Sequence, residues 1–212
     1  MGISTRNPPR LAEMITETMF AIPIGITQIS QSTCDKIKPL KGSTQNEATR
    51  DLFDVLKDYP EIKKVLTFTF TVWINELLKT PDSKWVMTTN WITENPTGYA
   101  MKPHSHKNCA YSGVLYFDKV DDSHEALWFD NPLTYFSSFL AESSSKNKFN
   151  IASYFVEPAE GRMIFFPSYL MHYHHAAKPT SIPRRSLACN FFPVGKYGGY
   201  DSYIDTNWLR HG

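Results

Sequence analysis

The pattern of hydrophobic positions changes character near residue 85. Upstream of it, residues 47–59 carry apolar side chains at helical spacing, preceded by capping side chains at 43–46. Pro60 suits the first position of a second helix, whose apolar face comprises Ile62, Val65, Leu66, Phe70, Trp73 and Leu77. Residues 67–72 also alternate with a period of two, but the longer helical register favours a helix. The pattern predicts two helices between residues 47 and 80.

Downstream of residue 85, short aromatic-rich runs alternate with clusters of turn-forming residues. The runs cover residues 85–93, 98–103, 109–118, 125–129, 151–157, 161–166, 171–177 and 184–193. A further run at 19–26 contains Pro23 and suits an edge strand. Short strands at close spacing predict a sandwich, jelly roll or barrel, so the fold class is mainly β with flanking α-helices. The polar stretch at 132–150 is a candidate lid loop.

Composition places the chain among ordinary globular proteins. Its 212 residues contain 22 Lys+Arg, 21 Asp+Glu and 14% aromatic side chains. With no internal repeat or linker, we expect a single domain, with a helical cover over residues 1–84, a β core over 85–195 and a tail over 196–212. The even charge gives no indication of a nucleic-acid partner, which usually requires a basic surplus.

Two further features suggest where the protein resides. Its three cysteines are far apart and form no CxxC pair, which favours a reducing compartment over a disulfide framework. No signal peptide is apparent, and no apolar run approaches the roughly 18 residues of a membrane helix. We expect a cytoplasmic protein, of a cell or of an infected host, that does not engage a membrane.

Five of the seven histidines fall in two short segments. His104 and His106 lie in KPHSHKNCAYSGVLYFD, and three more in FFPSYLMHYHHAAKP, beginning with His172. On a strand, residues at i and i+2 point to the same side, so the first pair can offer both imidazoles to one metal ion. A redox-active iron bound on one face by three protein ligands keeps positions open for other ligands, and a distant histidine such as His172 can be the third.

The usual set of ligands for such an iron is two histidines and one carboxylate. Here the second position of the motif is His106. Either the site consists of three histidines, or a carboxylate comes from elsewhere, with Asp130 in LWFDNP the candidate.

The segment RRSLACN supplies a candidate anion clamp. By strand alternation Arg184 and Ser186 share a face with Ala188 and Asn190. A guanidinium donates two parallel hydrogen bonds to a carboxylate, and a nearby hydroxyl adds a third donor. Arg185 alternates to the outer face, where we expect a solvated charge, although a shift of one residue would exchange it with Arg184.

The remaining candidates carry simpler expectations. His174 has the parity of His172 and is a candidate substrate contact, whereas His124, His175 and the C-terminal His211 are expected to be exposed. Trp91 and Trp128 are expected to pack inside the fold.

Three segments carry a resemblance to a known family. NWITENPTGYAMKPHSHKNCAYSGVLYFD, EGRMIFFPSYLMH and RRSLACNFF resemble the Fe(II)- and 2-oxoglutarate-dependent oxygenases, specifically a prolyl-4-hydroxylase-like group of marine bacteria and tailed phages. The run FAIPIG resembles the opening strand of that group, so the resemblance covers most of residues 19–194.

This resemblance implies a double-stranded β-helix, the cupin-like jelly roll, with Fe(II), 2-oxoglutarate as cosubstrate and O2. It implies that His104 and His172 bind iron and that His106 occupies the place usually held by Asp. It further implies that Arg184 binds the distal carboxylate of 2-oxoglutarate beside Ser186, and that Tyr116 hydrogen-bonds the cosubstrate. No catalytic residue is expected beyond this metal site.

The expected activity is that of a dioxygenase that hydroxylates a small-molecule or peptide substrate and releases succinate and carbon dioxide. One alternative is a three-histidine thiol dioxygenase, which would bind iron but not respond to 2-oxoglutarate. A second is another cupin-type metal protein that consumes no oxygen. A third is a non-catalytic phage protein that kept the fold and binds iron only weakly.

Overall fold

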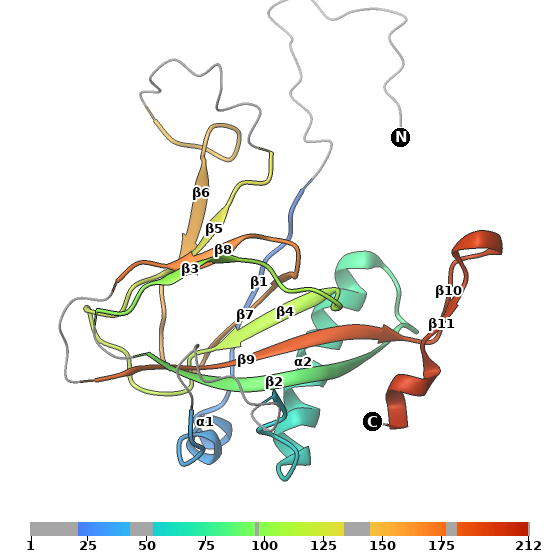
Figure 1. Cartoon of the computed structure of the whole chain (residues 1–212), viewed down its shortest axis with the longest axis horizontal. Coiled ribbons are helices and arrows are strands. Elements are labelled where there is room, and N and C mark those ends of the chain that lie inside the picture. The colour runs from blue at the N-terminus through green and yellow to red at the C-terminus, as the bar shows by residue number, and fades with distance from the viewer. Residues whose placement is uncertain (1–20, 43–52, 96–97, 134–144, 177–181, 212) are drawn as a thin grey trace, which may run out of the picture.

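The computed structural model describes residues 21–42, 53–95, 98–133, 145–176 and 182–211. Within them, two antiparallel sheets form a jelly roll (Figure 1), a five-stranded one in the order β1-β7-β4-β9-β2 and a four-stranded one in the order β3-β8-β5-β6. The strands of the larger sheet are Gly25–Gln28 (β1), Lys84–Asn95 (β2), Tyr111–Leu115 (β4), Arg162–Pro167 (β7) and Arg184–Val194 (β9). Those of the smaller sheet are Met101–His104 (β3), Leu127–Asp130 (β5), Ser153–Val156 (β6) and His172–His174 (β8). The predicted fold class is confirmed.

Each of the eight aromatic-rich runs overlaps one of the observed strands. The additional edge strand is also found, at Gly25–Gln28, where it pairs with β7 alone at the border of the larger sheet. The predicted run at 19–26 therefore lies slightly too early in the chain.

The helix α2, Pro60–Leu78, confirms the second predicted helix. Proline stands in its first turn with Glu61 near the positive end of the helix dipole, and the helix ends at Lys79 in a left-handed conformation. Its buried residues recur every four positions: Ile62, Leu66, Phe70 and Ile74. The predicted apolar face was too wide, because Val65 and Leu77 are 42% and 43% exposed.

The first predicted helix is wrong over its described part, because residues 53–59 form turns. Two of their backbone donors bond across to β2 instead of along a helix. The N–H of Leu56 donates to Oδ1 of Asn90 at 2.8 Å, and the N–H of Val55 donates to the Asn90 carbonyl. Residues 47–52 lie outside the described part of the chain.

A short helix, α1 (Gln31–Ile37), was not predicted. The hydroxyl of Ser30 caps it by accepting the N–H of Thr33 at 3.3 Å. Only Cys34 and Ile37 are buried within it, which is too few positions to establish a periodic pattern.

Alternation along the strands divides the core into two layers. One face of the larger sheet packs against α1 and α2, through side chains that include Leu115, Met163, Phe165, Leu187, Cys189 and Phe191. The other face turns toward the smaller sheet, and its Val114, Ile164 and Phe166 form a second cluster with Tyr116 and with Leu127 and Phe129 of the smaller sheet. Polar side chains on this inner face therefore lie inside the jelly roll.

After β9 the chain forms a small hairpin of Lys196–Tyr197 (β10) and Ile204–Asp205 (β11), with 3-10 turns at Tyr200–Ser202 (η4) and Asn207–His211 (η5). The hairpin projects beyond the end of the larger sheet (Figure 1). In the described residues, no helix combines the length and apolar character needed to cross a membrane.

Candidate metal centre

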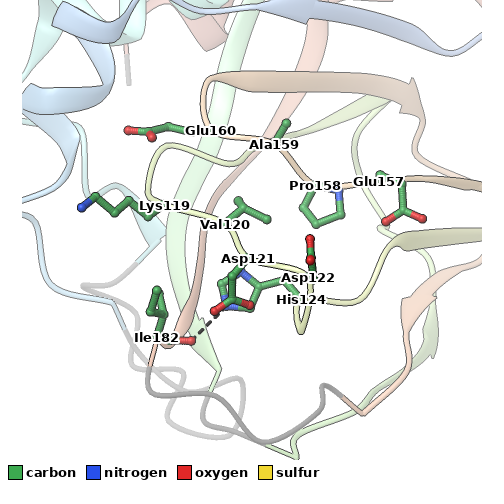
Figure 2. Close-up of a pocket in the computed structure, with 10 residues that line it drawn as sticks. All are labelled: Lys119, Val120, Asp121, Asp122, His124, Glu157, Pro158, Ala159, Glu160 and Ile182. Atoms are coloured by element: carbon green, nitrogen blue, oxygen red, sulfur yellow. Dashed lines mark hydrogen bonds between the residues drawn. The ribbon is translucent and has the colours of Figure 1, made fainter.

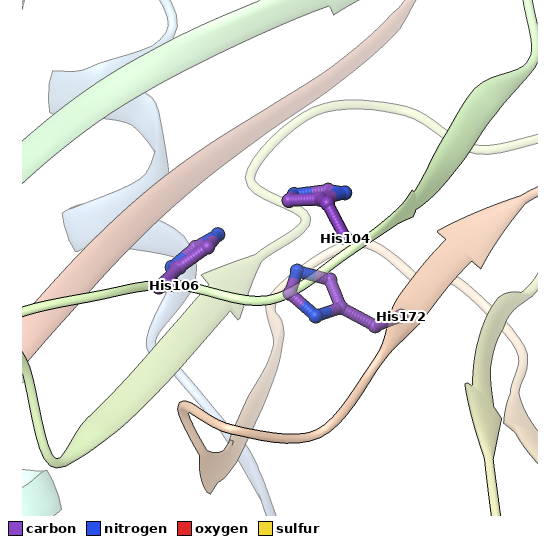
Figure 3. Close-up of side chains that lie close together, drawn as sticks. All are labelled: His104, His106 and His172. Carbon is purple, nitrogen blue, oxygen red and sulfur yellow. The ribbon is translucent and has the colours of Figure 1, made fainter.

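The side chains of three histidines lie close together (Figure 3). His104 ends β3 and faces His172 at the start of β8 across the sheet, and His106 follows in the loop before β4. One ligand atom from each lies within 4.8 Å of the others. His106 is placed by the loop rather than by strand alternation, and its N–H donates to the Ser168 carbonyl at 3.0 Å. The structure thus brings together the three histidines expected from the sequence.

Each of these imidazoles has its Nδ1 directed at an oxygen. The partner is the Lys102 carbonyl for His104 at 3.0 Å and the Leu170 carbonyl for His172 at 2.9 Å. For His106 it is Oδ1 of Asn190 at 2.7 Å. Because these oxygens only accept hydrogen bonds, Nδ1 carries the proton and the Nε2 lone pair is left for a metal.

The cluster favours neutral imidazoles. Burial, and after it the charges of His104 and His106, lowers the pKa of His172 to about 3. Burial also lowers the pKa of His106. Neutral histidines are the form that binds divalent metals, so the site is ready for a cation at neutral pH.

The structure does not bring Asp130 to this cluster. In β5 the neighbouring Phe129 pairs with His172 and points inward. Asp130 therefore faces outward beside Tyr173, whose pKa is raised by burial and then by the Asp130 charge. In the described part of the chain the group of potential ligands contains three histidines and no carboxylate.

A buried arginine lies on the inner face of β9. Arg184 is 5% exposed, and its Nη2 donates to the Tyr116 hydroxyl at 2.7 Å. Its guanidinium carbon also lies 5.0 Å from the centre of the Tyr116 ring. Nε has no partner, and none of the described carboxylates forms an ion pair with this guanidinium. A buried charge without a counter-ion is strongly unfavourable, so this position suits an anionic ligand.

Further polar side chains surround this arginine. Ser186 is buried two residues along the same face. Asn95 lies opposite Arg184 in the β2–β9 register, and its Nδ2 donates to Nε2 of His174 at 2.9 Å. Burial, and after it the Arg184 charge, lowers the pKa of His174 to about 4. His174 therefore lies inside the jelly roll as a neutral side chain.

Residues 89–190 match a family model described as "Putative 2OG-Fe(II) oxygenase". This segment, just under half of the chain, is therefore similar to the 2OG-Fe(II) oxygenases. The range includes the three clustered histidines as well as Tyr116, Arg184 and Ser186. No curated protein matches the chain in sequence.

Solved structures agree with the fold of a 2OG-Fe(II) oxygenase. The non-heme alpha ketoglutarate dependent epimerase SnoN from nogalamycin biosynthesis has a TM-score of 0.53 at 11% identity, covering 84% of this chain and 74% of its own. Iron-bound HygX from Streptomyces hygroscopicus has a TM-score of 0.51 at 12% identity, and the match covers 81% of this chain and 83% of HygX. A Pseudomonas putida prolyl-4-hydroxylase also matches, covering 81% of this chain and 85% of its own at 14% identity, but its TM-score of 0.48 is too low to support the fold assignment. At these identities the likeness concerns the fold alone.

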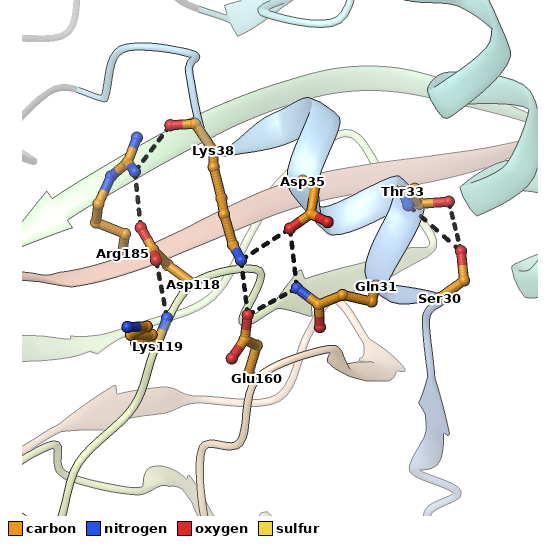
Figure 4. A network of polar contacts seen from close by, with 9 residues as sticks. All are labelled: Ser30, Gln31, Thr33, Asp35, Lys38, Asp118, Lys119, Glu160 and Arg185. Atoms are coloured by element: carbon orange, nitrogen blue, oxygen red, sulfur yellow. Dashed lines mark hydrogen bonds and ion pairs between the residues drawn. The ribbon is translucent and has the colours of Figure 1, made fainter.

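The outer face of β9 carries Arg185, and the expectation of a solvated charge there is wrong. Its side chain is 13% exposed and forms ion pairs with Asp118 at 2.8 Å and Glu94 at 3.2 Å. After α1 it donates to the Lys38 carbonyl at 3.0 Å (Figure 4). It also donates to the Leu40 carbonyl at 2.6 Å. The same figure shows Lys38 paired with Asp35 and Glu160. Arg185 thus anchors the segment after α1 to the sheet.

The surroundings of the three histidines also contain polar residues that were not assigned a role from the sequence. Ser112 on β4 and Asn190 on β9 both lie within hydrogen-bond distance of His106 Nδ1. Alternation had placed Asn190 on the inner face, but only the spatial approach of three separate segments shows which histidine it contacts. Trp91 lies beside His106 with a ring distance of 5.4 Å.

An open pocket of about 800 Å3 lies elsewhere on the molecule (Figure 2). It is lined by residues 119–122, His124, residues 157–160 and Ile182, and by none of the three clustered histidines. The expectation that His124 is exposed is wrong, since it is 6% exposed and its Nε2 bonds to the Ile182 carbonyl at 2.9 Å. His175 is exposed as expected.

Proposed function

We propose that this protein is an Fe(II)- and 2-oxoglutarate-dependent dioxygenase that hydroxylates its substrate and releases succinate and carbon dioxide. His104, His106 and His172 hold Fe(II), with the third histidine in the place of the usual carboxylate. Arg184 binds the distal carboxylate of 2-oxoglutarate, with Tyr116 and Ser186 beside it. O2 is the second cosubstrate.

The buried, uncompensated charge of Arg184 is the observation that carries this proposal. The guanidinium lies on the inner face of β9, the face that also presents Asn190 to His106. A dicarboxylate that reaches from this arginine to the metal would neutralise the buried cation through charge-assisted hydrogen bonds. The Tyr116 hydroxyl accepts from Nη2 and so fixes the orientation of the guanidinium before a ligand arrives.

Iron bound to the three histidines would supply the redox chemistry that activates O2. The protein's own contribution is to orient and shield. Carbonyl and amide oxygens fix the histidine tautomers. The ring centroids of Phe129 and Phe166 lie 6.3 and 4.8 Å from that of His172. The two rings form an apolar wall that excludes water on that side.

The neutral ligand set has a consequence for charge. With an imidazole instead of a carboxylate, the metal and its three protein ligands carry one more positive charge. This favours a dianionic cosubstrate, whose own charges offset those of the metal and Arg184. A small molecule or a peptide remains the proposed substrate class, with specificity in loops such as 119–125 and 132–150, and residues 134–144 of the candidate lid lie outside the described residues.

Anaerobic titration of the Fe(II)-loaded protein with 2-oxoglutarate tests the proposal. Chelation of the keto acid produces a weak visible charge-transfer band, which we expect in the wild type and in Arg162→Gln. Arg162 is a half-buried arginine at the start of β7 and serves as a matched control. Arg184→Gln should require at least tenfold more 2-oxoglutarate. A wild type that binds iron but shows no band would overturn the proposal.

The absence of a carboxylate from the described ligand group favours one other function, that of a three-histidine thiol dioxygenase. Such an enzyme would consume O2 with a cysteine-like thiol and would not respond to 2-oxoglutarate. The uncompensated Arg184 argues for the first proposal, because a thiol that chelates the metal directly does not require an anion clamp deep in the fold. Oxygen uptake with each cosubstrate separates the two functions.

A further inference from the structure

The three histidines are not held in the same way. The Nδ1 partners of His104 and His172 are backbone carbonyls two residues upstream in each case. A substitution of a side chain does not remove these acceptors. His106 is held instead by Oδ1 of Asn190 at 2.7 Å and by the hydroxyl of Ser112 at 2.9 Å. Its orientation therefore depends on side chains that a mutation can change.

The polar network around His106 is buried and fully connected. The Ser112 hydroxyl lies 2.8 Å from both the Ser168 hydroxyl and Oδ1 of Asn190, and Ser112 and Ser168 are at most 1% exposed. At the other end of the amide, Nδ2 of Asn190 donates to the Thr89 hydroxyl at 2.9 Å. In this arrangement Oδ1 is the end of the amide that faces the histidine.

One assignment of protons satisfies every donor. Ser168 donates to Ser112, Ser112 donates to Oδ1 of Asn190, and Nδ1–H of His106 donates to the same oxygen, which has two lone pairs. If the amide were reversed, its NH2 group would face Nδ1, and the proton of the imidazole would move to Nε2. A histidine protonated at Nε2 does not bind a metal through that atom.

We propose that Asn190, supported by Ser112, is a positioning residue that selects the metal-binding tautomer of His106. The proposal rests on the proposed function in one respect, that His106 is a ligand of the metal. Asn190 acts through its neutral acceptor oxygen, and its Nδ2 contact with Thr89 keeps that oxygen turned toward the histidine. His104 and His172 receive the equivalent restraint from their own backbone.

The identity of residue 190 also sets the strength of this ligand. A carboxylate accepts a stronger hydrogen bond than an amide and makes the opposite nitrogen of the imidazole a better donor to the metal. Asn190→Asp keeps the acceptor and adds this charge. Asn190→Leu keeps the branched shape and removes the acceptor, leaving His106 Nδ1 with only the Ser112 hydroxyl.

The test compares the wild type, Asn190→Leu, Asn190→Asp and Thr88→Val. Thr88 contributes a hydroxyl that bonds the Asn190 backbone carbonyl at 3.3 Å and not the network, so Thr88→Val is the control. Long-range 1H–15N spectra of the metal-free proteins report the tautomer of each histidine. Titration with Co2+, an air-stable substitute for Fe(II), reports the affinity of the site.

In the wild type and in Thr88→Val we expect all three histidines to be protonated at Nδ1. In Asn190→Leu, His106 should shift toward the Nε2–H form while His104 and His172 keep theirs, and Co2+ affinity should fall about 10–100-fold. Asn190→Asp should restore the tautomer and bind Co2+ at least as tightly as the wild type. A general loss of structure would change all three histidines together, so these two serve as internal controls.

The outcomes separate this inference from the proposed function. An Asn190→Leu protein with an unchanged His106 tautomer and Co2+ affinity within twofold of the wild type would overturn the role of Asn190. A wild type in which His106 has the expected tautomer, but which binds neither Co2+ nor Fe(II), would instead overturn the proposed function.

Discussion

Arg184 and Arg185 are consecutive residues of β9 whose guanidinium groups lie on opposite faces of the sheet. Arg184 donates to the Tyr116 hydroxyl inside the jelly roll, and Arg185 bonds Asp118 and the Lys38 carbonyl outside it. Because successive side chains of a strand alternate, one arginine faces the proposed cosubstrate and the other anchors the chain. Substitution of each should therefore affect a different property.

Arg184→Gln should weaken 2-oxoglutarate binding at least tenfold and leave the metal site intact. The substitution removes a charged donor from the carboxylate, and hydrogen bonds to charged groups contribute roughly 1.5–3 kcal/mol. Anaerobic calorimetry on the Fe(II)-loaded protein measures this affinity. Arg185→Gln is the matched neighbour and should leave the affinity of the folded protein within about twofold. Equal weakening by the two variants would mean that the inward and outward assignments are wrong.

Arg185→Gln should lower the free energy of unfolding by roughly 2–4 kcal/mol, because it leaves Asp118 and two carbonyls without their cationic partner. Urea unfolding followed by circular dichroism measures the change. Lys79→Gln is the control, since Lys79 pairs with Glu76 on the surface, where such pairs contribute at most about 1 kcal/mol. A loss for Arg185→Gln no larger than for the control would contradict an anchoring role.

His106→Ala should lower Co2+ affinity by about 100-fold or more, because two histidines hold a divalent ion far less well than three. His175→Ala removes an exposed imidazole of the same region and should bind like the wild type. Metal content after desalting and calorimetric titration both report the result. Stoichiometric, tight binding by His106→Ala would contradict the role of His106 as a ligand.

The metal-free protein should lose stability as the pH falls below about 6.5, the ordinary histidine pKa. Burial lowers the pKa of His172 to about 3 and that of His174 to about 4, so the unfolded chain binds protons that the fold rejects. Between its pKa in the folded protein and its pKa in the unfolded chain, each histidine changes the free energy of unfolding by up to about 1.4 kcal/mol per pH unit. Urea unfolding at pH 7.5, 6 and 5 measures this slope, and His174→Asn should reduce it. A stability that stays constant over this range would contradict burial of neutral histidines.

The strands and the helix α2 could be predicted because their signals are local. Alternating aromatic runs, turn clusters and a proline at a helix start are properties of adjacent residues. Residues 53–59 failed as a helix because Asn90, far along the chain, takes the backbone donors of Val55 and Leu56. A periodic pattern carries no information about such a distant acceptor.

In the candidate site, too, local patterns could be predicted and contacts between residues far apart in the sequence could not. The histidine segments and the alternation of Arg184 with Ser186 identified the inner face. The environment of Arg185 was misjudged because its partners, including the Lys38 carbonyl, are distant in sequence. The pairing of His106 with Asn190 likewise depends on which strands lie side by side, which composition and spacing do not determine.

The alternation of β9 also bears on how this protein can change. Leu187, Cys189 and Phe191 pack toward the helices, with Phe191 stacked on Phe70 at 4.1 Å, while Arg184, Ser186 and Asn190 face the site. Substitutions of the residues that face the site alter ligand preference without disturbing the packing of the residues that face the helices. Folding robustness and chemical specificity are thus encoded at interleaved positions of one strand, and a lineage could diversify in one while conserving the other.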